Sequence, residues 1–181
     1  LHNQDFITEK DIRIGDTVVV QKAGEIIPEI VSVVREKRPE GTTAYHLPET
    51  CPVCGAPVER DPDGAAIRCT GAECPAQLLR NLIHFASRDA MDIDGVGPAV
   101  MRQLIESGLV SNPADLYDLR AEQLADLERM GTKSAQNAVD AIAKSKENDL
   151  WRLIFALGIR GIGQRSAILL SQHFGTMDSV M

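Results

Sequence analysis

Four cysteines within 24 consecutive positions constrain this chain more than any other feature. They form a Cys-x-x-Cys pair, Cys51 and Cys54, and a wider pair, Cys69 and Cys74, with 14 residues between the pairs. This spacing is typical of one tetrahedral metal site. Thiolates are soft donors that suit Zn²⁺, and four of them close its coordination shell. The sequence therefore predicts one structural zinc ion bound by all four cysteines.

The segment between the cysteine pairs agrees with this prediction. Residues 61–64 read Asp-Pro-Asp-Gly, which is a favourable turn sequence because Pro stands second and Gly fourth. A turn there folds residues 57–60 back against residues 65–68. The two cysteine pairs are then brought together.

Two other uses of four cysteines remain open at this point. Two disulfides would fit the count, but the chain shows no secretory features. An iron site of the rubredoxin type uses the same four ligands, but both of its pairs would be expected at the tighter spacing, and the Cys69 to Cys74 spacing is wider. Zinc is the preferred interpretation.

The charge of the chain limits how it could bind nucleic acid. It carries 19 Lys and Arg against 26 Asp and Glu, for a formal net charge of -7, which argues against a broad basic binding surface. No run of about 18 apolar residues and no signal segment occurs. We therefore expect a soluble intracellular protein without a membrane partner. The opening at Leu1 and the end at Met181 suggest a piece of a longer polypeptide.

The N-terminal part has the composition of strands. Residues 11–20 and 26–34 are rich in β-branched residues, and residues 23–25 between them resemble a hairpin connection. Pro28 cannot donate to a ladder, so it marks an edge or a bulge. We expect half of a small β-barrel or sheet, followed by a polar linker over residues 36–50.

From Gln77 onward the apolar residues follow helical spacing, which predicts an all-helical C-terminal part. A short apolar helix, a tight Gly hairpin and another helix recur three times. We align the hairpins on Gly97, Lys133 and Gly163, which are 36 and 30 residues apart, so that Lys133 replaces a glycine in the middle copy. These intervals suggest duplicated helix-hairpin-helix units rather than a solenoid of fixed period.

The hairpins have a chemistry suited to phosphate. A helix N-terminus exposes unpaired N–H groups with a partial positive charge, and glycine lets a phosphate approach without meeting a Cβ. A single Gly-x-Gly is as well explained by helix termination, but three copies favour binding of a DNA backbone without sequence readout. The candidate residues are Gly95, Gly97, Gly131, Lys133, Gly161 and Gly163.

Taken in order, these parts resemble the middle and C-terminal portion of the bacterial NAD-dependent DNA ligase family. The resemblance is carried by five segments, residues 10–18, 23–29, 51–55, 127–137 and 153–160. It implies a multidomain fold: the C-terminal part of an OB-fold at residues 1–46, a four-cysteine zinc finger at 47–76, and a truncated tandem helix-hairpin-helix domain at 77–181.

The resemblance also implies an activity. In the family, a lysine takes AMP from NAD and passes it to a 5′-phosphate at a nick in duplex DNA, and the 3′-hydroxyl then displaces AMP during replication and repair. That lysine lies in a Lys-x-Asp-Gly motif, which none of the six lysines here matches. We therefore expect the adenylation domain upstream, a fourth helix-hairpin-helix and a BRCT domain downstream, no catalytic residue here, and NAD and Mg²⁺ used by the parent enzyme but not bound by this chain.

In the family, the OB-fold hairpin enters the minor groove opposite the nick, where an apolar pair presses on the bases. The matching positions are Ile26 and Ile27, although strand alternation would place one of them in the barrel core. Lys22 precedes the turn where the family often has two basic residues. The resemblance thus implies a DNA-binding clamp for nicked double-stranded DNA, monomeric and cytoplasmic, in contact with the nucleoid through DNA.

Two other functions fit parts of the sequence. A non-enzymatic recombination or repair scaffold can combine zinc modules with helix-hairpin-helix units, but it does not require residues 14–34 to be an OB-fold. An electron-transfer protein would hold iron at the cysteines and be coloured.

Overall fold

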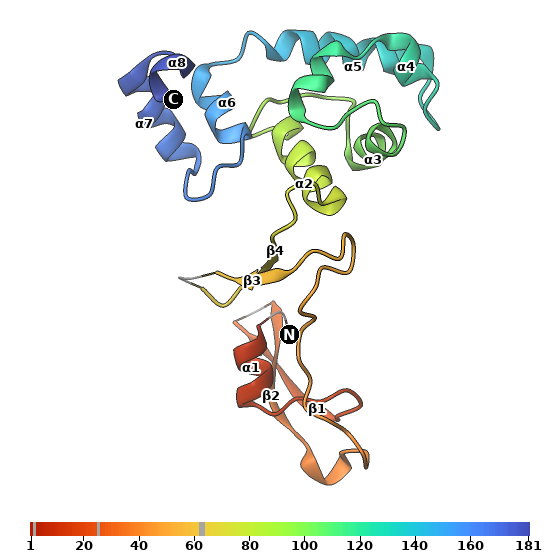
Figure 1. Cartoon of the computed structure of the whole chain (residues 1–181), viewed down its shortest axis with the longest axis vertical. Coiled ribbons are helices and arrows are strands. Elements are labelled where there is room, and N and C mark those ends of the chain that lie inside the picture. The colour runs from red at the N-terminus through yellow and green to blue at the C-terminus, as the bar shows by residue number, and fades with distance from the viewer. Residues whose placement is uncertain (2, 25, 62–63) are drawn as a thin grey trace. The chain divides into compact units, whose positions relative to one another are not determined.

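A computed structural model describes residues 1, 3–24, 26–61 and 64–181 of the chain (Figure 1). It divides the chain into two compact units, which we call unit 1 (Leu1–Ala72) and unit 2 (Glu73–Met181). All strands of the described residues lie in unit 1, and unit 2 is helical. The predicted multidomain fold, with small β parts followed by an all-helical part, is confirmed.

Unit 1 contains the hairpin expected from the β-branched runs. Strand β1 (Val18–Ala23) pairs antiparallel with β2 (Ile27–Val33). A register shift leaves Val31 as the extra residue of a bulge, whereas Pro28 pairs with Lys22 in regular register. Pro28 is tolerated because each strand of this two-stranded sheet has an unpaired outer edge. The connection turns at Gly24 (φ +63°), and Glu25, part of the expected hairpin connection, lies outside the described residues.

A short helix, α1 (Gln4–Glu9), precedes the hairpin and was not predicted. Its N-cap Asn3 accepts a hydrogen bond from the Asp5 backbone N–H at 2.8 Å, which satisfies one of the unpaired donors of the first turn. Ile7 is the one buried residue of the helix. Six residues are too few for a helical period to stand out in the sequence.

A 3₁₀ turn, η1 (Arg35–Lys37), leads away from the hairpin, and a second small sheet follows. Strand β3 (Val58–Arg60) pairs antiparallel with β4 (Ile67–Cys69). The predicted turn between them is closed by the Gly64 N–H, which donates to the Asp61 carbonyl at 3.2 Å. Its two central residues, Pro62 and Asp63, lie outside the described residues.

Unit 2 consists of seven α-helices and one 3₁₀ helix. They begin at Pro75, close to the predicted change at Gln77, and are α2 (Pro75–Ala86), α3 (Pro98–Glu106), η2 (Pro113–Asp118), α4 (Ala121–Ala125), α5 (Thr132–Ser145), α6 (Leu150–Ala156), α7 (Gln164–Phe174) and α8 (Met177–Val180). Helices α2 and α3, α4 and α5, and α6 and α7 pack against each other in sequence order. These three pairs are the predicted duplicated helical hairpins.

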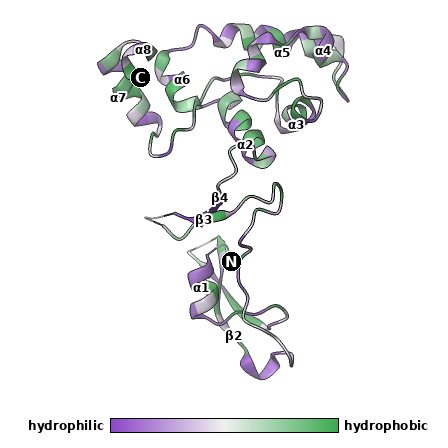
Figure 2. Cartoon of the chain, in the orientation of Figure 1, coloured by the Kyte–Doolittle hydropathy of each residue, from purple (hydrophilic) through white to green (hydrophobic). Residues whose placement is uncertain are grey.

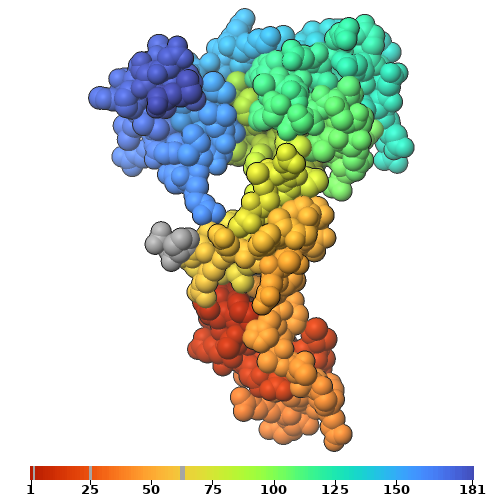
Figure 3. All heavy atoms as spheres, viewed as in Figure 1, coloured from red at the N-terminus to blue at the C-terminus, as the bar shows by residue number. Residues whose placement is uncertain are grey.

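The apolar stripes of these helices form one core. Leu82 of α2, Met101 and Leu104 of α3, and Leu124 of α4 are fully buried in it. Hydrophobic and hydrophilic residues are interspersed along each of these helices (Figure 2), and the atoms of α3 to α5 adjoin one another at the surface of unit 2 (Figure 3). Leu157 continues the helical spacing of the apolar residues of α6, but it is the C-cap of that helix and is 43% exposed. No helix of the described residues is long and apolar enough to cross a membrane.

Candidate metal centre and hairpin surfaces

The four cysteines predicted to bind zinc lie together. Their Sγ atoms are all within 4.8 Å of one another. Tetrahedral coordination with Zn–S bonds of about 2.3 Å places the sulfurs about 3.8 Å apart, so the cluster has the right size for one ion. None of the four forms a disulfide, and the Cys54 and Cys69 sulfurs are 3.4 Å apart. The residues therefore fit one Zn²⁺, which four thiolates would hold without an open position for water.

Backbone turns hold the cysteines in place. The Cys51 N–H donates to the Ala56 carbonyl at 2.8 Å, and the Gly55 N–H donates to the Cys51 carbonyl at 2.9 Å. Gly55 takes a φ of +73°, which closes this turn at little steric cost. Cys74 is the N-cap of α2, and Pro75 fills the first helical position.

The backbone around the cluster favours thiolates. The N–H groups of Cys54 and Val53 lower the pKa of the Cys51 thiol to about 7. The Gly71 N–H donates to the Cys69 sulfur at 3.3 Å. Metal binding requires deprotonated sulfur, so both features assist coordination.

Gly71 is a further residue of the metal centre that sequence reasoning missed. A Cβ at this position would lie 3.0 Å from the Ala56 Cβ, 3.1 Å from the Cys54 sulfur and 3.4 Å from the Cys69 sulfur. Only glycine therefore fits between the two cysteine pairs without moving them. The one feature of the sequence that could have indicated this role is the position of Gly71 between Cys69 and Cys74.

The helical hairpins correct our alignment of the three copies. The N-caps of α3, α5 and α7 are Gly97, Gly131 and Gly163, each with an extended backbone. They are 34 and 32 residues apart, so Gly131 is the equivalent of Gly97 and Gly163, and Lys133 is the second residue of α5. The alignment on Lys133 was wrong because it matched Gly131 to the first glycine of the other two hairpins. The helix starts show that Gly131 matches their second glycine.

This alignment identifies an unusual residue that the sequence analysis missed. Two positions before the N-cap, Gly95 and Gly161 take φ values of +86° and +82°, and the middle copy has Arg129 at +61°. A left-handed backbone is unfavourable for a residue with a Cβ. Arg129 is exposed, and its guanidinium therefore lies at the surface of the middle hairpin.

The glycines of the hairpins differ in their surroundings. A Cβ on Gly95 would lie 3.0 Å from the Cβ of Ala138, a fully buried residue of α5. A Cβ on any of Gly97, Gly131, Gly161 or Gly163 would have nothing within 4 Å. Gly95 thus allows its hairpin to pack closely on α5. The other four glycines and Lys133 lie at the surface, where a ligand can approach them.

The tip of the β1–β2 hairpin is apolar and exposed. Ile26 is 83% exposed and Ile27 is 68% exposed. Both face outward because Ile26 belongs to the turn and only Ile27 belongs to the strand, so strand alternation does not separate them. Lys22 is also exposed, and it pairs with Pro28 across the ladder.

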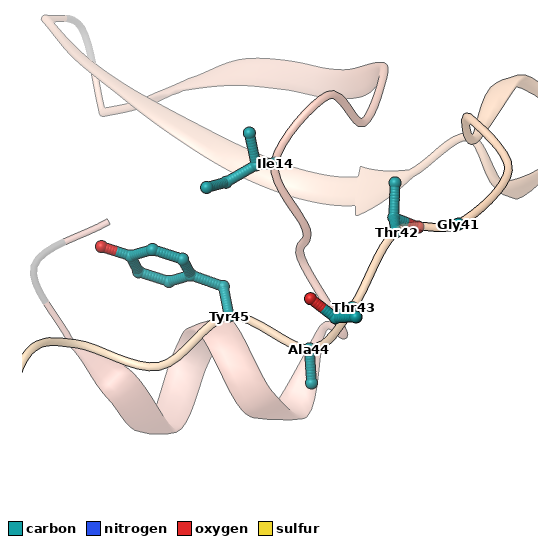
Figure 4. A pocket seen from close by; sticks show the side chains of 6 residues that line it. All are labelled: Ile14, Gly41, Thr42, Thr43, Ala44 and Tyr45. Atoms are coloured by element: carbon teal, nitrogen blue, oxygen red, sulfur yellow. The ribbon is translucent and has the colours of Figure 1, made fainter.

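One hollow of about 200 Å³ lies in unit 1 (Figure 4). The Ile14 side chain and the Tyr45 ring point into it. Its lining contains the hydroxyls of Thr42, Thr43 and Tyr45 and no charged side chain. It offers no acid, base or metal ligand set for catalysis.

Comparison with family models assigns each part of the chain. Residues 1–42 match the NAD-dependent DNA ligase OB-fold domain, and residues 50–76 match the NAD-dependent DNA ligase C4 zinc finger domain. Residues 87–144 match a SAM-like helix-hairpin-helix tandem, and residues 152–181 match a helix-hairpin-helix motif. By its fold and metal centre, the chain is thus an OB-fold and zinc-finger protein with tandem helix-hairpin-helix units.

Curated relatives named DNA ligase match this chain along its whole length. It is 60% identical over 181 residues to a DNA ligase of Heliobacterium modesticaldum, 58% identical over 181 residues to one of Thermoanaerobacter sp., and 56% identical over 183 residues to one of Acetivibrio thermocellus. All of this chain is covered, and the match spans 27%, 27% and 28% of these relatives. The chain carries domains of the NAD-dependent DNA ligase family, as the resemblance predicted.

Proposed function

We propose that the chain is the DNA-binding clamp portion of an NAD-dependent DNA ligase that seals nicks between a 5′-phosphate and a 3′-hydroxyl in duplex DNA. The observation that supports this most directly is the three helical hairpins with glycine N-caps at Gly97, Gly131 and Gly163, all exposed and open to a ligand. N–H groups at such helix starts bind phosphate oxygens and read no sequence. The domain division at 1–46, 47–76 and 77–181 is part of this proposal.

The β1–β2 hairpin provides a second DNA contact in this proposal. Ile26 and Ile27 form an exposed apolar tip, and apolar side chains inserted in the minor groove unstack and bend duplex DNA. Lys22 would add a phosphate contact on the adjoining strand. Together with the hairpin glycines, Lys133 and Arg129, this tip would hold a nicked duplex in the geometry needed for in-line attack.

The zinc ion would have a structural role in this function. Its four thiolates would leave no coordination site for a substrate, and the ion would fix the short β3–β4 sheet and the start of α2, where Cys74 is the N-cap. Structural zinc sites contribute directly to folding free energy. The family match to a C4 zinc finger at residues 50–76 favours zinc over iron.

The chain alone would not perform the reaction. None of Lys10, Lys22, Lys37, Lys133, Lys144 and Lys146 stands in a Lys-x-Asp-Gly motif. Adenylate transfer from NAD, with Mg²⁺, would therefore depend on a lysine that this chain does not supply. We also propose that the parent enzyme is monomeric and cytoplasmic, that it contacts the nucleoid through DNA, and that it acts in replication and repair.

A repair scaffold without ligase activity is the second candidate. It shares the zinc finger and the helical hairpins, but the match of residues 1–42 to the ligase OB-fold domain favours the ligase. The test is a titration of the 181-residue chain against fluorescent nicked duplex, intact duplex and single strand. The proposal predicts preference for nicked duplex, and equal affinity for all three would contradict it.

Incubation with labelled NAD tests the catalytic part. No covalent adenylate should form on the chain. An adduct on any of the six lysines would overturn the assignment of this chain as a non-catalytic clamp.

A further inference from the structure

Unit 1 has very little apolar core to hold the β1–β2 hairpin in one orientation. Among the described residues of this unit, the buried apolar residues are Ile7 and Cys51. Most residues of both strands are exposed. An isolated two-stranded hairpin is marginally stable in water. Something other than apolar burial must therefore orient it.

A network of two arginines and two aspartates lies at the base of this hairpin. The Arg38 Nε donates to Asp16 Oδ1 at 2.8 Å and its Nη1 donates to Asp11 Oδ2 at 2.7 Å. Its Nη2 donates to Asp16 Oδ2 at 3.0 Å and to the Asp11 carbonyl at 2.5 Å. Arg13 Nε donates to Asp11 Oδ1 at 2.9 Å, and Arg13 Nη1 donates to the Thr42 carbonyl at 2.8 Å.

The network is shielded from water at its centre. The Asp16 side chain is 1% exposed and that of Arg38 is 15% exposed. The Arg13 hydrogen bond, followed by those of Arg38, lowers the pKa of Asp11 to about 2, and Arg38 lowers the pKa of Asp16. The carboxylates are therefore charged at neutral pH, and a planar guanidinium bridges both of them.

The network joins the chain entering the hairpin to the chain leaving it. Asp16 lies two residues before β1 begins at Val18, and Arg38 lies five residues after β2 ends at Val33. Strand β1 has six residues and extends about 20 Å at roughly 3.3 Å per residue. A rotation of about 10° at the base would thus displace Ile26 and Ile27 by roughly 3 Å.

We propose that Arg38 is a positioning residue for DNA binding: by bridging Asp11 and Asp16 it orients the β1–β2 hairpin so that Ile26 and Ile27 meet the minor groove. This inference rests on the proposed function, because it concerns the same hairpin tip. Arg38 itself does not touch DNA. It acts through Ile26 and Ile27. The experiment therefore measures whether the effect of Arg38 on DNA affinity depends on these two side chains.

The test compares Arg38→Met in the wild-type chain and in a chain that also carries Ile26→Ala and Ile27→Ala. In the wild-type background, the affinity for a fluorescent nicked duplex should fall by on the order of tenfold. In the alanine background, Arg38→Met should cause no further loss, because the tip it positions is gone. Arg35→Met removes the same charge from the exposed neighbouring turn η1 and should leave the affinity unchanged.

Two measurements separate positioning from loss of the fold. In ¹⁵N relaxation experiments, Arg38→Met should increase the mobility of residues 18–33 while zinc content and the helical signal of unit 2 stay unchanged. Arg38→Lys keeps the charge but cannot bridge both carboxylates as a planar fork, so it should restore part of the affinity. If Arg38→Met and Arg38→Lys both unfold unit 1, the role of Arg38 is structural and the inference is wrong.

The outcomes are distinguishable. Equal losses from Arg38→Met in both backgrounds, or no loss in either, would overturn the inference while the wild-type chain still binds nicked DNA. Wild-type affinity in the Ile26→Ala, Ile27→Ala chain would overturn the minor-groove contact and this inference with it. Absence of binding by the wild-type chain would instead contradict the proposed function as a whole.

Discussion

Unit 2 buries Leu82, Met101 and Leu104 completely, whereas unit 1 buries only Ile7 and Cys51 among its described apolar residues. The helical unit is thus held by a continuous apolar core of the usual kind. The β unit relies on the cysteine cluster and on the ion pairs of Arg38. The two units of this chain thus owe their order to different interactions, and each should lose its order under a different treatment.

Removal of the metal should produce the largest difference between the two units. Chelation of zinc should abolish the order of the β3–β4 sheet, because structural zinc contributes about 10–16 kcal/mol of binding free energy in small finger domains. Hydrogen exchange should show lost protection in residues 51–74 and retained protection in α3 and α5. Equal loss of protection in both units would contradict the conclusion that the two units are stabilised by different interactions.

Gly71→Ala is a milder test of the same site. It places a Cβ against two of the sulfurs and should weaken zinc binding. Gly64→Ala is the matched control in the same finger, because its nearest contact is 3.6 Å away.

Truncation of an apolar side chain should cost far more stability in unit 2, where it is buried, than in unit 1, where it is exposed. Leu104→Ala removes a fully buried side chain of unit 2 and should lower the free energy of unfolding of that unit by about 2–5 kcal/mol. Val20→Ala in β1 removes a side chain that is 54% exposed and should cost well under about 1 kcal/mol. Urea unfolding followed by signals from each unit would measure both, and a larger cost for Val20→Ala would contradict the account.

The smallest expected difference in stability is between alanine substitutions at two glycines of unit 2. Gly95→Ala and Gly161→Ala impose similar backbone strain, since their φ values are +86° and +82°. Only the first also forces a methyl group against Ala138, so Gly95→Ala should be the more destabilising by about 1–3 kcal/mol. Thermal unfolding of the two variants gives this difference directly, and equal values would show that the Gly95 contact relaxes without cost.

Sequence patterns predicted the features that depend on local periodicity or on ligand type. The helical spacing after Gln77 gave the three helical hairpins, and Cys51, Cys54, Cys69 and Cys74 gave the metal centre. Both patterns can be recognised within a short stretch of consecutive residues. The family resemblance added the OB-fold, which the two strands alone indicated only as a small barrel or sheet.

The features that sequence analysis missed depend on contacts between distant residues. Arg38 and Asp11 are 27 positions apart, and Gly95 meets Ala138 across two helical hairpins. No periodicity marks such pairs. The middle hairpin was misaligned because its left-handed residue is Arg129 and not a glycine, so that its one glycine, Gly131, was matched to Gly95 and Gly161 although it is the N-cap of α5.

Substitution of Gly163 tests the proposed DNA-binding role of the helical hairpins most directly. Gly163 is the N-cap of α7, has an ordinary φ of -82° and has open space around its Cα. Gly163→Asp should therefore keep the fold or stabilise it by a few tenths of a kcal/mol, because aspartate is a favourable N-cap. The same aspartate would repel a phosphate at the helix start, so affinity for nicked DNA should fall by about 1–3 kcal/mol.

The measurement is a titration of nicked duplex by the wild type, Gly163→Asp, Gly163→Ser and the surface control Glu147→Gln across a salt series. Backbone N–H donors release few counterions, so the wild-type slope of log K against log salt should be shallow, with a magnitude of about 2–4. Gly163→Ser, a cap without charge, should lose less affinity than Gly163→Asp, and Glu147→Gln should change little. A steep slope together with unchanged affinity of Gly163→Asp would contradict the account, since basic side chains and not the hairpin backbone would then hold the DNA.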